Sequence, residues 1–244
     1  MSKQHRGIIL ACACLLSLTL ATAALLRPAT ASPAGGEALV ELSDGPPLVA
    51  LTFDDGPRPD TTARLLDGLA LREAQATFFL VGERIPGNEA LIQRMSEEGH
   101  QVGVHSYSHI RITALSGPDF NFEVGKTRAQ LTNILGSREF WLRPPYGIVD
   151  DSVLKRAGSP VILWSLDPED WKDRDVDRIV GAVLSQVRDG DIILFHDIYD
   201  SSVDAALQVA DALLQRGYCL VTVEQLFQLK EISLQNGIIY QKAK

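Results

Sequence analysis

The stretch LTFDDGPRPD, residues 51–60, changes abruptly from apolar to charged and turn-forming residues. An apolar run over residues 48–53 has the length of a buried strand and stops at two adjacent carboxylates, Asp54 and Asp55. A Gly-Pro pair follows, and both residue types favour a turn over a continued strand. The turn does not account for Asp54, because a charge at the end of a buried strand is costly to desolvate. The end of this strand is therefore a candidate functional position.

Outward from this stretch, short apolar runs alternate with segments of helical periodicity. The runs are PLVALTF (47–53), ATFFLVG (76–82), HQVGVH (100–105), FWLR (140–143), VILWSL (161–166), DIILFH (191–196) and YCLVTV (218–223). The helical patterns cover residues 61–71, 119–135, 176–187 and 202–216.

This alternation, without a two-residue hairpin signal, predicts βαβ units and a mostly parallel sheet. About seven strands favour an α/β fold of the (β/α) barrel kind, short of eight strands. An open, doubly wound sheet is the alternative. The glycine signature G-x-G-x-x-G of a nucleotide fold is absent after the first strand.

The amino terminus is expected to lie outside the fold. Basic residues precede an apolar segment and small residues follow it, which predicts a signal peptide or an N-terminal membrane anchor over residues 1–31. We expect a linker over residues 32–45, a catalytic domain over 46–230 and a C-terminal tail over 231–244. Both versions of the amino terminus place the domain outside the cytoplasm, because the basic residues stay inside.

Composition excludes some classes of protein. The formal net charge of the 244 residues is -8, which disfavours a nucleic-acid partner. Of the three cysteines, only Cys219 lies beyond the apolar segment, so the domain has neither a disulfide framework nor a cysteine metal site. Cys219 stands in an apolar run and is interpreted as a core residue.

Polar side chains stand at or just after the ends of five of these runs. They are Asp54 and Asp55, His105 and His109, Arg143, Asp167 and Asp170, and His196 and Asp197. In a parallel (β/α) fold the carboxyl ends of the strands share one face, and that face carries the active site. Any one of these residues has a plausible structural role, but the same explanation for all five strand ends is hard to sustain.

The histidines indicate a metal. His105 and His109 are four residues apart and would share a face if the segment after the strand turned helically. Two imidazoles and one carboxylate form a three-ligand site with open positions for water and substrate, for which zinc is the first choice and other divalent ions are alternatives. His100 begins its strand and is interpreted as a surface or packing residue. A buried His196 facing a carboxylate is a candidate acid.

The motifs TFDDGP, HSYSH, RPPYG, DPEDW and LFH resemble, in order, the five motifs of the polysaccharide deacetylases, carbohydrate esterase family four. The resemblance extends over residues 46–227 and shows no departure at a motif position. It implies a distorted (β/α) barrel and removal of N-acetyl groups from amino sugars or O-acetyl groups from xylan.

The resemblance also implies a role for each matching residue. It implies that Asp54 is the general base and that Arg143 orients it. The implied metal ligands are Asp55, His105 and His109.

The remaining implied roles belong to the acid and the substrate pocket. Asp170 would tune His196, the general acid, and Tyr146 would offer its backbone N–H to the oxyanion. Trp171 and Leu194 resemble the apolar walls around the acetyl methyl group.

The resemblance, together with the predicted metal site, implies a metal-dependent hydrolase that removes N-acetyl groups from an N-acetylglucosamine polysaccharide, peptidoglycan or a chitin-like glycan, with a metal-bound water as nucleophile. The cofactor would be Zn²⁺, with Co²⁺ or another divalent ion as the alternative. An O-acetyl esterase on xylan or another glycan, a non-catalytic carbohydrate-binding homologue and an amidohydrolase on a non-sugar amide remain open. A glycosidase is disfavoured because it would leave the two-histidine site unexplained.

The expected partner is the acetylated polysaccharide itself. We expect a monomer in the periplasm, cell envelope or extracellular space, with membrane contact only through an uncleaved N-terminal segment.

Overall fold

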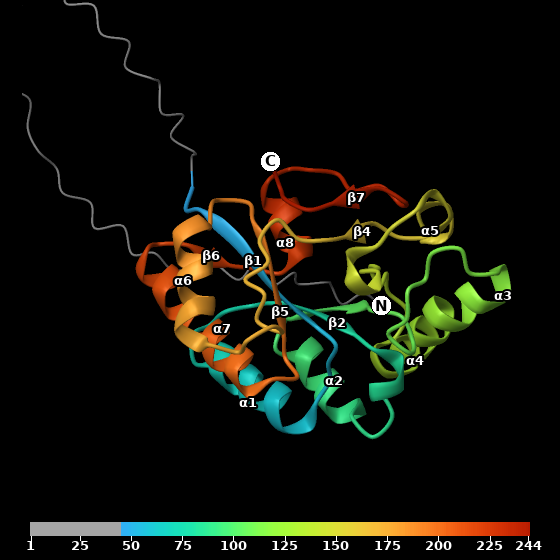
Figure 1. Cartoon of the computed structure of the whole chain (residues 1–244), viewed down its shortest axis with the longest axis horizontal. Helices are drawn as coiled ribbons and strands as arrows, with labels where there is room; N and C mark the ends of the chain where they lie inside the picture. The colour runs from blue at the N-terminus through green and yellow to red at the C-terminus, as the bar shows by residue number, and fades with distance from the viewer. Residues whose placement is uncertain (1–44) are drawn as a thin grey trace, which may run out of the picture. The chain divides into compact units, whose positions relative to one another are not determined.

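The computed structural model describes residues 45–244, in which parallel strands alternate with helices (Figure 1). Four strands pair in the order β3–β2–β1–β5, and β6 pairs with the beginning of β1. A second sheet joins β4 and β7. The strands are β1 (Leu48–Asp54), β2 (Thr77–Leu80), β3 (Gln101–Val104), β4 (Val161–Ile162), β5 (Ile192–His196), β6 (Cys219–Leu220) and β7 (Ile239–Tyr240).

The helices surround the strands. Helices α6, α7, α1, α2 and α4 contact one another in that order, and Figure 1 shows α1, α2 and α7 together below the strands. The helices are α1 (Pro59–Ala70), α2 (Glu89–Glu97), α3 (Gly117–Phe120), α4 (Lys126–Leu135), α5 (Asp151–Arg156), α6 (Val176–Gln186), α7 (Asp200–Gln215) and α8 (Val223–Leu229). Tight 3₁₀ turns occupy Gly82–Arg84 and Pro145–Gly147, and a π-helical turn occupies Asn121–Gly125.

Regular pairing does not run all the way around the strands, but single parallel bridges connect the two sheets. Leu142 bridges Val104 of β3 and Val161 of β4, and Leu166 bridges Ile193 of β5. The predicted α/β fold with parallel strands is therefore confirmed. The barrel is distorted, because the named strands alone do not close it.

Two strand predictions need correction. The run FWLR forms only the two single-residue bridges of Leu142, because the two prolines that follow Arg143 have no N–H to continue a ladder. The strand β7 was not expected, and it lies in the segment 231–244 that the sequence set apart as a tail. That segment also places Ala243 in the core, where its N–H donates to the Gly190 carbonyl at 2.9 Å.

Strand β1 is the centre of the fold. All seven of its residues are buried, as expected for a strand with neighbours on both sides. Phe53 stacks on Phe78 of β2 and Phe195 of β5, with ring centroids 5.3 Å and 5.8 Å apart. Each buried phenylalanine contributes about 1.5–3 kcal/mol through burial. This packing fixes the carboxyl ends of β1, β2 and β5 relative to one another.

The predicted signal or anchor over residues 1–31, and all but the last residue of the linker over 32–45, lie outside the described residues. Within residues 45–244, no helix has the length and apolar character needed to cross a membrane.

Candidate active site

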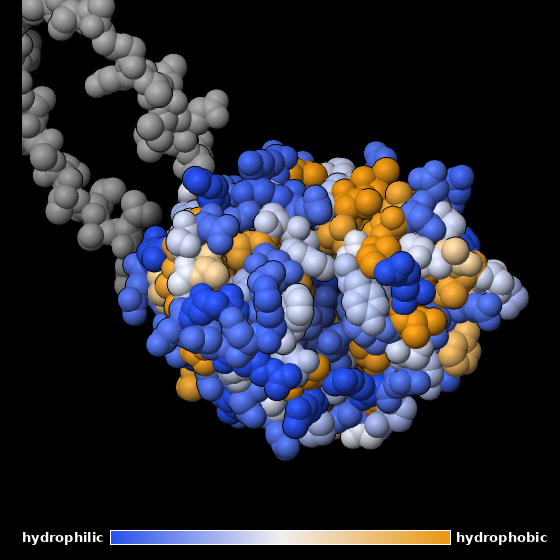
Figure 2. Space-filling model, viewed as in Figure 1, coloured by the Kyte–Doolittle hydropathy of each residue, from blue (hydrophilic) through white to orange (hydrophobic). Residues whose placement is uncertain are grey.

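A cavity of about 370 Å³ opens at the carboxyl ends of the strands. The face shown in Figure 2 is hollowed near its centre. Polar and apolar side chains from the strand ends and the loops that follow them line the cavity: Asp54, Asp55, His105, His109, Asp167 and His196, with Tyr146, Trp164, Trp171, Leu194 and Tyr199 as its walls. Of the sequence candidates, Arg143 and Asp170 lie behind this lining and Asp197 points elsewhere, as described below.

Asp54 is held by a buried arginine. Nη1 of Arg143 donates to Asp54 Oδ1 at 2.8 Å and to the Thr52 hydroxyl at 2.8 Å. The guanidinium also donates to the carbonyls of Ile162 and Leu163, at 3.1 and 3.0 Å, and its side chain is fully buried. A buried charge needs such complete partnering. Asp54, 2% exposed, is thus kept in one orientation at the cavity.

Asp55 leaves the strand and faces the two histidines. Its φ of 73° turns the chain out of β1, and its carboxylate faces the same cavity as that of Asp54. Its Oδ1 lies 3.6 Å from Nε2 of His105 and 3.1 Å from Nε2 of His109. One ligand atom from each of the three residues lies within 4.8 Å of the others.

The two histidines do not meet through a helical turn, as the sequence spacing suggested. Residues 105–109 form a loop in which Ser106 and His109 have φ of 60° and 55°, and these left-handed positions bring the second imidazole back beside the first. The π-helical turn supports this loop from behind. Glu123, buried there, accepts the N–H groups of Tyr107 and Ser108, both at 3.0 Å.

The donor set fits a divalent metal ion. Nδ1 of His105 lies 2.7 Å from the Arg143 carbonyl oxygen and donates to it, so Nε2 carries the lone pair that faces Asp55. Burial lowers the pKa of His105 against the opposing charges of Asp54 and Asp55, which favours the neutral ligand form. The pKa of Asp55 is also lowered: burial raises it, but the hydrogen bond with His109 and the histidine charges outweigh burial. A carboxylate and two neutral imidazoles suit zinc and similar ions.

His196 stands at the end of β5 on a buried carboxylate. Its Nδ1 lies 2.8 Å from Asp170 Oδ1, and its backbone N–H donates to Asp170 Oδ2, also at 2.8 Å. Burial lowers the pKa of His196, but the hydrogen bond and charge of Asp170, together with Asp54 and Asp55, raise it to about 9. This imidazole is therefore protonated at neutral pH and leaves Nε2–H as its second donor.

The predicted substrate wall comes from two loops, which carry Tyr146 and Trp171, and from strand β5, which carries Leu194. Tyr146 has a φ of 63°, is 60% exposed, and donates its hydroxyl to the His109 carbonyl at 3.2 Å. Trp171 is 48% exposed and Leu194 is 2% exposed, and both line the cavity. Trp164 and Tyr199 also form the wall and were not predicted from the sequence. Their positions beside the motifs were a signal, because Trp164 lies in an apolar run and Tyr199 three residues after His196.

Two other predictions concern residues beside the cavity. Asp197 is fully buried and accepts a hydrogen bond from Thr62 instead of lining the cavity. His100 lies at the start of β3, buried, with Nδ1 accepting the Ala76 N–H at 3.1 Å. It is the packing residue that its position indicated.

This site combines a metal donor set of one aspartate and two histidines with two further groups, Asp54 held by Arg143 and His196 held by Asp170. Such a combination is typical of metal-dependent hydrolases. The family model described as polysaccharide deacetylase matches residues 42–160. A peptidoglycan-N-acetylglucosamine deacetylase of Bacillus cereus is 34% identical over 78% of this chain and 92% of the relative. This chain therefore belongs to the polysaccharide deacetylase family.

Other relatives show the range of this family. The peptidoglycan-N-acetylmuramic acid deacetylase PdaC of Bacillus subtilis is 44% identical over 75% of this chain, and the matched part is 39% of PdaC. The solved PdaC structure superposes with a TM-score of 0.74 at 43% identity, over 76% of this chain and 92% of that structure. An acetyl xylan esterase from Clostridium thermocellum, in complex with a cobalt ion, matches with a TM-score of 0.76 at 32% identity, over 80% of this chain and 98% of that structure.

Proposed function

We propose that this protein is a metal-dependent hydrolase that removes N-acetyl groups from a polysaccharide containing N-acetylglucosamine, with peptidoglycan favoured over chitin-like glycans. The proposal rests on one observation: a carboxylate and an imidazole face the same cavity, and each is held by its own buried partner. Asp54 is fixed by Arg143, while His196 is protonated and fixed by Asp170. Such a base and acid beside a metal donor set suit amide hydrolysis.

Asp54 serves as the general base. Its Oδ1 is occupied by Arg143, whereas Oδ2 faces His105 Nε2 at 3.7 Å, on the side of the metal donor set. A water held between this carboxylate and the substrate loses its proton to Asp54 as it attacks the acetyl carbonyl carbon. Arg143 keeps the base in one rotamer, so no reorientation is needed during the step.

Asp55, His105 and His109 hold the metal, for which we propose Zn²⁺, with Co²⁺ as an alternative. The ion, when bound, supplies a Lewis acid that polarises the acetyl carbonyl and lowers the pKa of water. The backbone N–H of Tyr146 stabilises the oxyanion of the tetrahedral intermediate. Trp171 and Leu194 enclose the acetyl methyl group.

His196 completes the reaction as the general acid. Its Nε2–H transfers a proton to the sugar nitrogen as the C–N bond breaks, because an amine anion is a very poor leaving group. The products are acetate and a free amino sugar. Asp170 keeps the imidazole in the tautomer that presents Nε2 and stabilises its charge.

We further propose that the protein acts outside the cytoplasm, in the periplasm, cell envelope or extracellular space, and that it works as a monomer on the glycan. The basic and apolar amino-terminal sequence and the peptidoglycan deacetylases among its relatives support this location. Membrane contact would come only from an uncleaved N-terminal segment.

The first test is acetate release by the purified protein, chelated and then given Zn²⁺, from penta-N-acetylchitopentaose, peptidoglycan and acetylated xylan. Acetate from the first two in a metal-dependent reaction supports the proposal. Acetate from xylan alone identifies an O-acetyl esterase, the second candidate, which the likeness to an acetyl xylan esterase favours. Bound metal with no acetate from any substrate identifies a non-catalytic carbohydrate-binding protein.

The matching variant is Asp54→Asn. We expect kcat to fall at least 10²-fold, because general-base catalysis contributes about that much, while metal still binds, because the three proposed ligands are untouched. Metal content is measured by atomic absorption on the same sample. Undiminished turnover with metal bound would remove Asp54 from the mechanism.

A further inference from the structure

An arginine that has no part in the proposed reaction stands beside the cavity. The guanidinium carbon of Arg174 lies 3.9 Å from the centroid of the Tyr199 ring, and Tyr199 lines the cavity. Arg174 belongs to the loop between Trp171 and α6, and Tyr199 directly precedes α7. The contact thus joins the loop that carries Trp171 to the loop that follows His196, at the edge of the site.

Arg174 makes no ion pair with any residue in the described range 45–244, although acidic residues flank it. Asp173 pairs with Nε of Arg178 at 2.6 Å and accepts the Asp175 N–H at 3.2 Å. Asp175 caps α6 by accepting the Arg178 N–H at 3.1 Å. The nearby Glu169 pairs with Lys172 at 2.9 Å. These carboxylates therefore have other partners. Arg174, which has a left-handed φ of 57°, packs on the Tyr199 ring.

A guanidinium held over an aromatic ring is prepared to bind an anion. The ring shields one face of the cation and limits its rotation, while the N–H groups at its edge remain able to make paired hydrogen bonds to a carboxylate. Because the group is already ordered, binding costs less side-chain entropy than for a free surface arginine.

We propose that Arg174, supported by Tyr199, forms an anion-binding subsite at the mouth of the catalytic cavity, and that it binds a carboxylate carried by the glycan. This inference rests on the proposed function. In a cell-wall glycan the carboxylate comes from the lactyl group of a muramic acid residue or from an attached peptide. Chitin oligomers and xylan backbones carry no such group, so the subsite selects carboxylated glycans over neutral ones.

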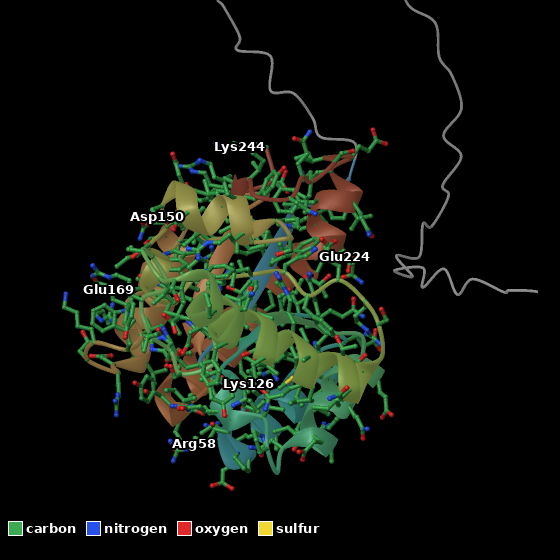
Figure 3. All side chains as sticks on the ribbon, turned by 90° about the vertical axis from the view of Figure 1, so that its right-hand side faces the viewer. Arg58, Lys126, Asp150, Glu169, Glu224 and Lys244 are labelled. Carbon is green, nitrogen blue, oxygen red and sulfur yellow. The ribbon has the colours of Figure 1, made fainter. Side chains whose placement is uncertain are left out.

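The charges around the subsite allow this assignment. Asp54 is compensated by Arg143, and Asp55 faces the two histidines. Asp167, the remaining carboxylate of the lining, accepts the Glu169 N–H at 2.8 Å, and burial, with the charge of Asp170, raises its pKa. A second concave surface has Glu224 in its lining, and Figure 3 shows Glu224 and Glu169 on opposite sides of the molecule. That surface therefore does not continue the substrate path.

The test compares kcat/KM for acetate release on three substrates. Penta-N-acetylchitopentaose is neutral, amidase-stripped peptidoglycan chains carry free lactyl carboxylates, and muropeptides carry peptide carboxylates. The variants are Arg174→Gln, which removes the charge, and Arg174→Lys, which retains it without the planar group. Arg188→Gln is the matched control, because Arg188 is also exposed and without an ion pair among the described residues, but precedes the amino end of β5.

We expect Arg174→Gln to lower the ratio of kcat/KM on a carboxylated glycan to that on the neutral oligomer about tenfold, as for loss of a charge-assisted hydrogen bond. Arg174→Lys should retain part of the ratio, high salt should reduce it in the parent protein, and Arg188→Gln should leave it unchanged. The carboxylated substrate that shows the effect identifies the source of the anion. An equal loss on all substrates would show that Arg174 only positions Tyr199, and an unchanged ratio would also overturn the proposal.

Binding separates this inference from the proposed reaction. Calorimetric titration of metal-loaded parent, Arg174→Gln and Arg188→Gln proteins with the stripped glycan and with muropeptides requires no turnover. Affinity for at least one of them that weakens only in Arg174→Gln, without acetate release from any substrate, would support the subsite and refute the deacetylase. Acetate release, together with equal affinities in all three proteins, would support the deacetylase and refute the subsite.

Discussion

Two carboxylates that are neighbours in sequence have separate surroundings in this protein. Asp54 ends a strand and pairs with Arg143 in a fully buried contact. Asp55 has a φ of 73°, and its carboxylate lies nearest to His109 and also faces His105. Adjacent like charges thus face one cavity with different nearest partners, Arg143 for Asp54 and His109 for Asp55.

The pKa of His196 depends on its partner, Asp170. Its pKa is raised to about 9 although burial alone would lower it, chiefly by the hydrogen bond and charge of Asp170. Because the folded pKa exceeds the unfolded value of 6.5, the pair stabilises the fold fully below pH 6.5. This stability is lost as pH rises through about 9.

Asp170→Asn should therefore lower the pKa of His196, since the neutral amide no longer favours the imidazolium. We expect the alkaline limb of the kcat profile to move down by one pH unit or more, with a lower maximum. Nuclear magnetic resonance titration of the imidazole in metal-free protein measures the pKa directly, because a bound cation would itself lower it. An alkaline limb and imidazole pKa that both stay in place would contradict the assignment of Asp170.

At the scale of elements, the loop after β1 is fastened to the loop after β5. Arg58 donates to the Ile198 carbonyl at 2.9 Å, and Thr62 of α1 donates to Asp197. Gly56 passes so close to Asp197 that a Cβ on it would lie 2.5 Å from both carboxylate oxygens. The backbone beside Asp55 is thereby held against the end of the strand that carries His196.

Gly56→Ala tests this contact. The added methyl group must displace the loop or Asp197, which we expect to cost about 1–3 kcal/mol of unfolding free energy and to weaken metal binding. Gly181→Ala is the matched control: it lies inside α6 with nothing within 4 Å of the new Cβ, and should stabilise the protein by about 0.5–1 kcal/mol. Urea unfolding and chelator competition give the two quantities. Equal effects of the two substitutions would show that the loop tolerates displacement.

The elements also show what the sequence could predict. The parallel α/β fold followed from apolar runs such as residues 48–53, and the polar groups after them followed from the shared face of strand ends. The left-handed turns at Ser106 and His109 were not predictable, because no glycine marks them. Nor was the π-helical turn, which interrupts the helix predicted over 119–135 in order to place Glu123 under the histidine loop. Such features depend on contacts distant in sequence.

On the scale of the whole molecule, the proposed metal would join two strands. Asp55 follows β1, whereas His105 and His109 follow β3, and β2 lies between them in the sheet. An ion bound only by the folded chain adds about 2.7 kcal/mol at a hundredfold excess over its Kd. For a domain of this size, chelation should lower Tm by about 5–10 °C, and zinc should restore it.

Differential scanning calorimetry with and without chelator measures this change. The control is His109→Ala, which removes one proposed ligand and should make Tm insensitive to both chelator and zinc. If zinc raised the Tm of this variant as much as that of the parent protein, the proposed site would be refuted.

The position of strand β1 in the chain affects when its sheet can form during synthesis. It is the earliest strand of the described chain, yet its neighbours include residues 192–196 and 219–220. Contacts across such sequence separations form slowly, because long loops must close first. During synthesis, the segment that carries Asp54 and Asp55 therefore waits for nearly the whole domain before its pairing is complete. Under the proposed export, this delay would leave the sheet around β1 incomplete while the chain is still being threaded across a membrane.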